Sequence, residues 1–237
     1  MKLQITPLGD RALTVDLADR IEEVAVRRIH RACGWLAEPP LPGVAELVPA
    51  ATTITLFYSP QELLAAGAPA ADLAGWLAAR VRERLATLPE SNSGPPPRLI
   101  AIPVCYGGQC GPDLEAVAAR VGLSTAEVIS RHRAAEYFVL QLGFAPGFPY
   151  LHGSPEALSV PRRDTPRTEV PAGSVGIANG QSCIYPVAIP GGWNLIGRTP
   201  LRLFRPERQP PALLQAGDRV QFRAISPDEF EHWEQSS

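Results

Sequence analysis

The distribution of proline and glycine restricts the fold of this chain more than any other feature of its sequence. Its 237 residues include 26 prolines and 20 glycines, and beyond Tyr137 these residues separate apolar runs that are too short for helices. Proline disrupts a helix interior because it lacks an N–H group, whereas strand ends and sheet edges tolerate it. Short apolar runs between regular turn signals predict a sandwich or a closed barrel. The runs are Phe138 to Phe144, Ser174 to Ala178, Ile184 to Ile189, Leu195 to Ile196, Leu201 to Phe204 and Arg219 to Ile225.

A different pattern precedes residue 91. Two strand-like runs lie between Leu3 and Leu17, and Val44 to Tyr58 alternates between polar and apolar residues as strands do. Apolar residues have helical spacing from a cap at Asp19 to Leu36, and again from about Ala70 to Leu88. The order β-α-β-α predicts a small α/β sandwich with both helices on one face of the sheet.

The stretch Ser91 to Pro97 is polar and rich in proline, which is typical of an extended linker. After it we expect a strand from Leu99 to Tyr106 and two short helices, Pro112 to Val121 and Thr125 to His132. Ser124 and Glu127 are spaced as a capping box for the second helix. We therefore expect an α+β protein. Residues 1–90 form an N-terminal α/β sandwich domain, 91–97 a linker and 98–237 a β-barrel domain.

Charge and composition exclude several classes of function. The formal net charge of −2 provides no electrostatic footprint for nucleic acid or for an anionic membrane. Lys2 is the only lysine, which excludes an internal Schiff-base lysine and the lysine of a P-loop. If the chain handles ATP, it does so without a Walker A motif.

The cysteines and the apolar stretches indicate an ordinary intracellular protein. The four cysteines lack the spacing of zinc ligands, so we expect structural thiols and no metal site. No apolar stretch is long enough to span a bilayer, and the N-terminus lacks the apolar core of a signal peptide. We expect a cytoplasmic protein without a membrane segment.

Three arginines, Arg162, Arg163 and Arg167, lie in a segment that prolines hold at three places, between Pro161 and Pro171. Proline lowers the entropy cost of ordering such a segment. Arginine binds carboxylate or phosphate through two parallel hydrogen bonds. The pattern predicts an anion site; the alternative is a solvated loop in which the arginines pair with Asp164 and Glu169.

Two further segments combine aromatic residues with turn formers. Phe144, Phe148 and Tyr150 alternate with Gly and Pro, which favours a rigid apolar wall of a pocket or partner interface over a plain corner between strands. A glycine pair precedes Trp193 and Asn194, and Arg198 follows. These side chains are suited to stacking, amide and charge contacts with a ligand.

His132 and Glu136 lie near the end of a predicted helix. A histidine and a carboxylate at this spacing are suited to sharing a proton in catalysis. A structural hydrogen bond of His132 is the alternative interpretation.

Several of these segments together resemble one family, and the resemblance covers nearly the whole chain in order. The chain is similar to the KipI family, also called allophanate hydrolase subunit 1 and the 5-oxoprolinase B-subunit family. One departure is Gln181-Ser182-Cys183, where the family usually has Gln-Thr-Gly. The matching segments are Gly9 to Leu13, Ile102 to Gly108, Gly111 to Leu114, Gly143 to Leu151, Pro161 to Gly176, Tyr185-Pro186 and Gly191 to Pro200.

The resemblance implies a small N-terminal α/β domain and a C-terminal cyclophilin-like β-barrel. It also implies part of an ATP-dependent 5-oxoprolinase, which converts 5-oxoproline, ATP and water to glutamate, ADP and phosphate. A KipA-like partner subunit would complete the active site and share the ATP, and a LamB/YcsF-like partner subunit would join the reaction.

On the enzyme hypothesis this chain is inactive alone. Its arginines, Arg198 included, bind a carboxylate or phosphate, while Gln181 and Asn194 orient an amide. Two alternatives remain: a KipI-type inhibitor of a sensor histidine kinase, and one component of a urea- or allophanate-processing enzyme.

Overall fold

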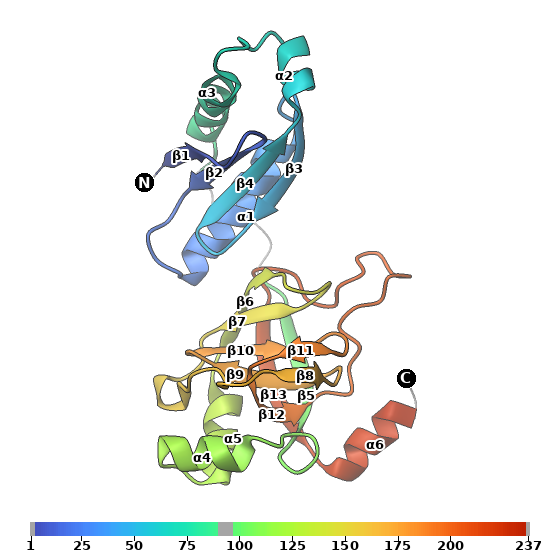
Figure 1. Ribbon diagram of the computed structural model, residues 1–237. Helices are drawn as coiled ribbons and strands as arrows, with labels where there is room; N and C mark the ends of the chain where they lie inside the picture. The colour runs from blue at the N-terminus through green and yellow to red at the C-terminus, as the bar shows by residue number, and fades with distance from the viewer. Residues whose placement is uncertain (1–2, 90–96, 236–237) are drawn as a thin grey trace. The chain divides into compact units, whose positions relative to one another are not determined.

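The computed structural model describes residues 3–89 and 97–235, and the chain divides into two compact units, residues 1–96 and 97–237 (Figure 1). The predicted linker at 91–97 lies outside the described residues except for Pro97. No helix in the two described stretches is both long and apolar enough to cross a membrane.

The first unit is a four-stranded antiparallel sheet that two helices cover. The strand order is β1-β2-β4-β3. Residues Ile54, Leu56 and Tyr58 of β4 are buried while Phe57 is exposed, so one face of the sheet is covered. Ile29 of α1 and Leu77 of α3 belong to the same core as Ile54, which places both helices on that face as expected. The elements are β1 (Gln4–Pro7), β2 (Ala12–Asp16), α1 (Glu23–Ala37), β3 (Val44–Pro49), β4 (Thr53–Tyr58), α2 (Pro60–Ala65) and α3 (Leu73–Ala86).

Two details of this unit differ from the prediction. The first helix begins after Glu22 instead of Asp19, and Glu22 makes no side-chain capping bond. The short helix α2 was not predicted; proline at its start and Ser59, which accepts a hydrogen bond from the Glu62 N–H, explain its formation.

The second unit is built on a closed seven-stranded barrel with the order β10-β7-β6-β13-β5-β12-β9. The β5 and β13 strands pair in parallel, and the other neighbours are antiparallel. The expected α+β fold with a barrel is confirmed. The elements are β5 (Leu99–Tyr106), α4 (Leu114–Val121), α5 (Thr125–Ala134), β6 (Tyr137–Leu142), β7 (Pro149–His152), η1 (Glu156–Leu158), β8 (Arg167–Val170), β9 (Ser174–Ala178), β10 (Gln181–Ile184), β11 (Ile189–Gly191), β12 (Asn194–Arg198), β13 (Arg219–Ile225) and α6 (Pro227–Gln235).

Alternate residues of the barrel strands pack into two different cores. One core combines Val104, Ile177 and Phe222 of the strands with Val117 and Val128 of the helices α4 and α5. The other core lies between the barrel wall and the small β8–β11 sheet, which Figure 1 shows lying over β9 and β10. Its members include Phe148, Val170, Cys183, Tyr185 and Trp193.

The predicted strands of this unit are partly confirmed. The strands β9 and β13 have the expected bounds, and the capping box of α5 is present. The prediction of a strand from Ile184 to Ile189 is wrong, because β10 ends at Ile184 and β11 begins only at Ile189. The predicted strand from Leu201 to Phe204 is also wrong, since only an isolated β-bridge from Phe204 to Ala212 forms there. The elements β7, β8 and α6 were not predicted.

The turn before α4 lies against the backbone of β12. The Gly107 N–H donates to the carbonyl of Ile196 at 3.1 Å, and the Asp113 N–H donates to that of Leu195 at 2.9 Å. A Cβ atom on Gly111 would lie 2.1 Å from the carbonyl oxygen of Ile196. Only glycine permits this approach, which fixes the position of Asp113.

We predict that Gly111→Ala lowers the free energy of unfolding by about 2–3 kcal/mol, because the new methyl group overlaps backbone that cannot move aside. Gly143→Ala is the matched control in the same unit, since its Cβ would meet nothing within 4 Å. We expect the control to stay within about 0.5 kcal/mol of the parent chain. Urea unfolding measures both, and equal stability of the two variants would contradict the prediction.

Candidate functional site

Asp113 is the centre of a charged cluster in the second unit. Its side chain is only 8% exposed, and Oδ1 accepts hydrogen bonds from Arg163 Nη1 at 3.0 Å and Arg167 Nη2 at 2.8 Å. Oδ2 accepts from the Leu195 N–H at 2.7 Å. The carboxylate therefore joins the start of α4, the strand β12 and the arginine segment.

Asp113 was not predicted as a site residue, although it lies in one of the segments that match the family. Asp164 and Glu169 were the expected partners in the solvated-loop alternative, but both are exposed and Asp113 takes the two arginines instead. An aspartate before a helix usually caps that helix. Asp113 makes no such bond with α4, so its carboxylate is available to the arginines.

Backbone contacts hold the arginine segment on the barrel. Asn194 Nδ2 donates to the carbonyl oxygens of Pro161 at 2.8 Å and Ile177 at 3.2 Å. The Arg163 N–H donates to the carbonyl oxygen of Gly192 at 2.8 Å. The amide nitrogen of Asn194 thus positions the segment, and its predicted contact with a substrate amide stays a prediction.

The three arginines of this segment differ in what they contact. The guanidinium of Arg162 is exposed and lies 5.4 Å from the centre of the Trp193 ring, within cation–π range. Arg167 Nη1 is buried and has no hydrogen-bond partner among the described residues. The Asp113 carboxylate pairs with two guanidinium groups, those of Arg163 and Arg167, which leaves one positive charge of this cluster without a carboxylate partner.

The aromatic residues that were predicted to form a pocket wall form mainly a packed core. Phe148 is fully buried, 5.1 Å from the Tyr150 ring and 5.2 Å from the Tyr185 ring, and Trp193 is 5% exposed. Phe144 is different, because its side chain is 66% exposed and its backbone φ is +70°. Such a φ is strained for a bulky residue. Tyr150 and Phe144 thus remain the accessible members of the set.

His132 lies fully buried against four barrel strands. Its Nδ1 is 2.8 Å from the Tyr106 hydroxyl, its Nε2 is 3.2 Å from Ser182 Oγ, and its ring stacks on Phe222 at 4.5 Å. Ser182 Oγ in turn donates to the carbonyl oxygen of Gly176 at 3.1 Å. All three hydrogen bonds can form at once if Tyr106 donates to Nδ1 of a neutral imidazole and the Nε2–H of that imidazole donates to Ser182 Oγ.

Burial also keeps this ring neutral, because it lowers the pKa of His132 to about 3. Burial raises the pKa of Tyr106, which keeps that hydroxyl protonated as a donor. The structure does not bring His132 and Glu136 together: Glu136 is exposed, and both ring nitrogens of His132 have other partners. The geometry favours the structural hydrogen bond over a shared proton.

The Ser182-Cys183 departure is compatible with this packing. Ser182 retains the hydroxyl that the usual threonine would supply to His132. The Cys183 thiol is fully buried in the core under β8 and β11, and burial raises its pKa, which makes it unreactive. Gln181 begins β10 opposite Ala178.

Arg198 lies away from the charged cluster. It is four residues from Asn194 along β12, or about 13 Å at the usual rise of a strand. Its Nε donates to the carbonyl oxygen of Ala172 at 2.8 Å, and its guanidinium lies 5.5 Å from the Phe230 ring of α6. Arg198 thus contacts the chain after β8 and the helix α6, whereas Arg163 and Arg167 contact Asp113.

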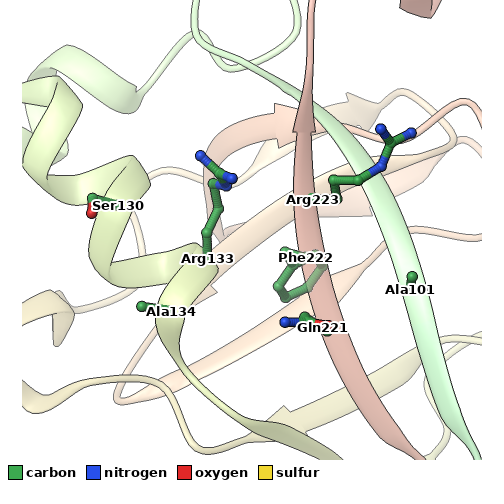
Figure 2. A pocket seen from close by; sticks show the side chains of 7 residues that line it. All are labelled: Ala101, Ser130, Arg133, Ala134, Gln221, Phe222 and Arg223. Carbon is green, nitrogen blue, oxygen red and sulfur yellow. The ribbon is translucent and has the colours of Figure 1, made fainter.

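A pocket of about 410 Å³ lies between α5 and the strands β13 and β5. Figure 2 shows the Phe222 ring between Arg133 of α5 and Arg223 of β13. None of these residues was predicted as a site, because nothing in their local sequence marks them. Within the described residues, no three His, Cys, Asp or Glu side chains are grouped as metal ligands would be.

Comparison with known proteins decides the family. The family model described as "Carboxyltransferase domain, subdomain C and D" matches residues 3–214. The chain belongs to this family. A Bacillus subtilis (strain 168) protein, by name the B subunit of 5-oxoprolinase, is 44% identical over 239 residues, which cover 100% of this chain and 99% of that protein. The resemblance found in the sequence motifs is thus confirmed.

Solved structures show the same fold. The crystal structure of TTHA0988 has a TM-score of 0.76 and 36% identity, and the match covers 91% of this chain but 40% of that one. The Kluyveromyces lactis urea carboxylase also has a TM-score of 0.76 at 17% identity, covering 97% of this chain and 22% of that one. At this identity the second likeness concerns the fold alone.

We predict that His132 makes the second unit sensitive to acid. The folded-state pKa of about 3 lies below the ordinary value of 6.5, so the unfolded chain takes up the proton first as the pH falls. The contribution to stability is complete above pH 6.5 and decreases toward pH 3, by up to about 1.4 kcal/mol per pH unit.

Urea unfolding at pH 7, 6 and 5 measures this effect by comparing the parent chain with His132→Gln, which cannot titrate. The parent should lose stability more steeply over this range. Should His132→Gln fail to fold, NMR of the imidazole in the parent chain is the second measurement. Parallel pH profiles, or a His132 ring that is charged at pH 5, would contradict the assignment.

Proposed function

We propose that this chain is the B subunit of an ATP-dependent 5-oxoprolinase. The observation that carries the proposal is the full-length similarity to a protein of that name, at 44% identity. The substrate is a lactam, which is a stable amide. Transfer of a phosphoryl group from ATP to the lactam oxygen releases ADP and activates the carbonyl carbon. One water then adds to this carbon and the C–N bond breaks, which opens the ring and leaves an acyl phosphate, and a second water releases glutamate and phosphate.

The charged cluster around Asp113 is the best candidate for the anion-binding part of this site. Asp113 holds Arg163 and Arg167 through one nitrogen each, and Arg167 Nη1 has no hydrogen-bond partner among the described residues. A buried donor without a partner is unfavourable, and an incoming carboxylate or phosphate oxygen would satisfy Arg167 Nη1. Arg162 adds a further positive charge beside the Trp193 ring.

We further propose that a second protein completes this site. Arg162 and Phe144 are exposed, and Phe144 has a strained backbone φ of +70° while its ring meets the Phe148 ring with a centroid distance of 5.4 Å. An exposed aromatic ring of this kind is suited to contact with a partner. A KipA-like subunit is the proposed partner at this surface and shares the ATP, and a LamB/YcsF-like subunit takes part in the reaction. The exposed Phe144 also suits the alternative, an inhibitor that docks on a sensor histidine kinase.

Reconstitution tests the proposed function. The purified chain alone should produce no glutamate from 5-oxoproline and ATP, whereas the chain mixed with its KipA-like and LamB/YcsF-like partners should produce glutamate, ADP and phosphate together. Turnover by the isolated chain would contradict the shared site. An inactive mixture, together with inhibition of a sensor kinase, would favour the regulatory alternative.

Arginine-to-lysine variants test the anion site. Lysine keeps the charge beside Asp113 but loses the planar fork, so Arg163→Lys and Arg167→Lys should retain nearly the parent melting temperature. In the reconstituted enzyme we expect at least one of them to lower kcat/KM roughly thirtyfold or more, which is about 2 kcal/mol of transition-state energy. Arg120→Lys, at an exposed position on α4, is the matched control. Full activity of both lysine variants would exclude the anion site.

A further inference from the structure

A second group of arginines lines a pocket of about 330 Å³ in the barrel unit, at the segment between β12 and β13. Arg98 precedes β5, while Arg202, Arg205 and Arg208 come from this segment. No acidic side chain is among the residues that line the pocket. The pocket shares no residue with the cluster around Asp113.

One of these arginines is held in place by a buried carboxylate. Arg98 Nε donates to Asp218 Oδ1 at 2.8 Å, and Arg98 Nη2 pairs with Asp218 Oδ2. Asp218 is 5% exposed and also accepts from the Gln215 N–H at 2.7 Å. The bond to Asp218 raises the pKa of Arg98. This pair is neutral overall and forms a fixed edge of the pocket.

The other three arginines have no such compensation. No ion pair joins Arg202, Arg205 or Arg208 to an acidic side chain of residues 3–89 or 97–233. Three guanidinium groups around one hollow repel one another, although the whole chain has a net charge of −2. This concentration of charge is therefore a local feature and does not extend over a generally basic surface.

The backbone of the segment is restrained around these side chains. The Arg205 N–H donates to the carbonyl oxygen of Pro211 at 2.8 Å, and the Arg208 N–H donates to that of Arg205 at 3.0 Å. Proline at 206, 210 and 211 limits the conformations of the segment before any ligand binds. The entropy cost of ordering the arginines around an anion is therefore lower than it would be in a flexible segment.

We propose that this arginine pocket binds a polyphosphate group, of the kind that a nucleoside di- or triphosphate carries. Three uncompensated guanidinium groups match the three to four negative charges of such a chain better than the single charge of a carboxylate. Because the chain has no P-loop lysine, a phosphate site in it needs other donors, and arginine supplies a charged, planar one. The inference rests on the pocket and does not require the proposed function.

Calorimetry on the full chain alone tests the proposal, with tripolyphosphate, ADP, ATP and adenosine as probes at low ionic strength. Tripolyphosphate and both nucleotides should bind, and adenosine should not. The variant Arg202→Gln/Arg205→Gln/Arg208→Gln should weaken binding at least tenfold while its melting temperature stays unchanged. Arg120→Gln is the matched control, an exposed arginine outside the pocket that should bind like the parent.

Each outcome decides a separate point. ATP binding much tighter than tripolyphosphate identifies a nucleotide as the source of the phosphates, and equal affinities identify the phosphate chain alone as sufficient. No binding of tripolyphosphate, or the same loss in Arg120→Gln as in the triple variant, would overturn the proposal. Because no partner and no 5-oxoproline are present, this result is independent of the reconstitution assay.

Discussion

The buried carboxylate of Asp113 is the interaction on which the arrangement of the barrel unit's surface depends. A carboxylate that is 8% exposed is unfavourable unless cations and N–H groups surround it. Three groups donate to this carboxylate: two arginines of the arginine segment and one backbone N–H of β12. They lie 50 to 82 residues after Asp113 in the sequence. Satisfying one charge therefore fixes three segments relative to one another, and Gly111 permits the close approach that makes this possible.

Much of the fold follows from local patterns, and the misses have physical causes. The strands β9 and β13 were found with correct bounds because turn signals flank both: β9 is a short apolar run, and β13 alternates Val220, Phe222 and Ala224 with polar residues. Leu201 to Phe204 looks equally apolar, yet the prolines after it prevent a ladder of backbone hydrogen bonds, and only one bridge forms. The strand β8 carries Arg167 and Glu169 in an outer sheet, so its sequence lacks the apolar alternation of a buried strand.

The candidate site was predictable in its residue types but not in its contacts. Three arginines between prolines indicated an anion site, whereas the common partner of Arg163 and Arg167 lies 50 or more residues earlier and carries no local signal. The same holds for His132, whose partners Tyr106 and Ser182 lie 26 and 50 residues away. Helical spacing placed His132 correctly on α5, but only the closed barrel shows that the ring is buried and that both of its nitrogens have hydrogen-bond partners.

The parallel pairing of β5 with β13 has a consequence for synthesis of the chain. The barrel closes only when Leu99 meets Arg219, and the adjoining Arg98–Asp218 pair spans 120 residues. A ribosome that adds about 5–20 residues per second needs roughly 6 to 24 seconds to make this stretch. During that time the edges of β5 have no partner strand from β13, and unpaired edges invite pairing with other chains. The first unit, in contrast, is synthesised completely before β5 emerges. We therefore expect the barrel unit to be the part of the nascent protein that is most exposed to pairing with other chains.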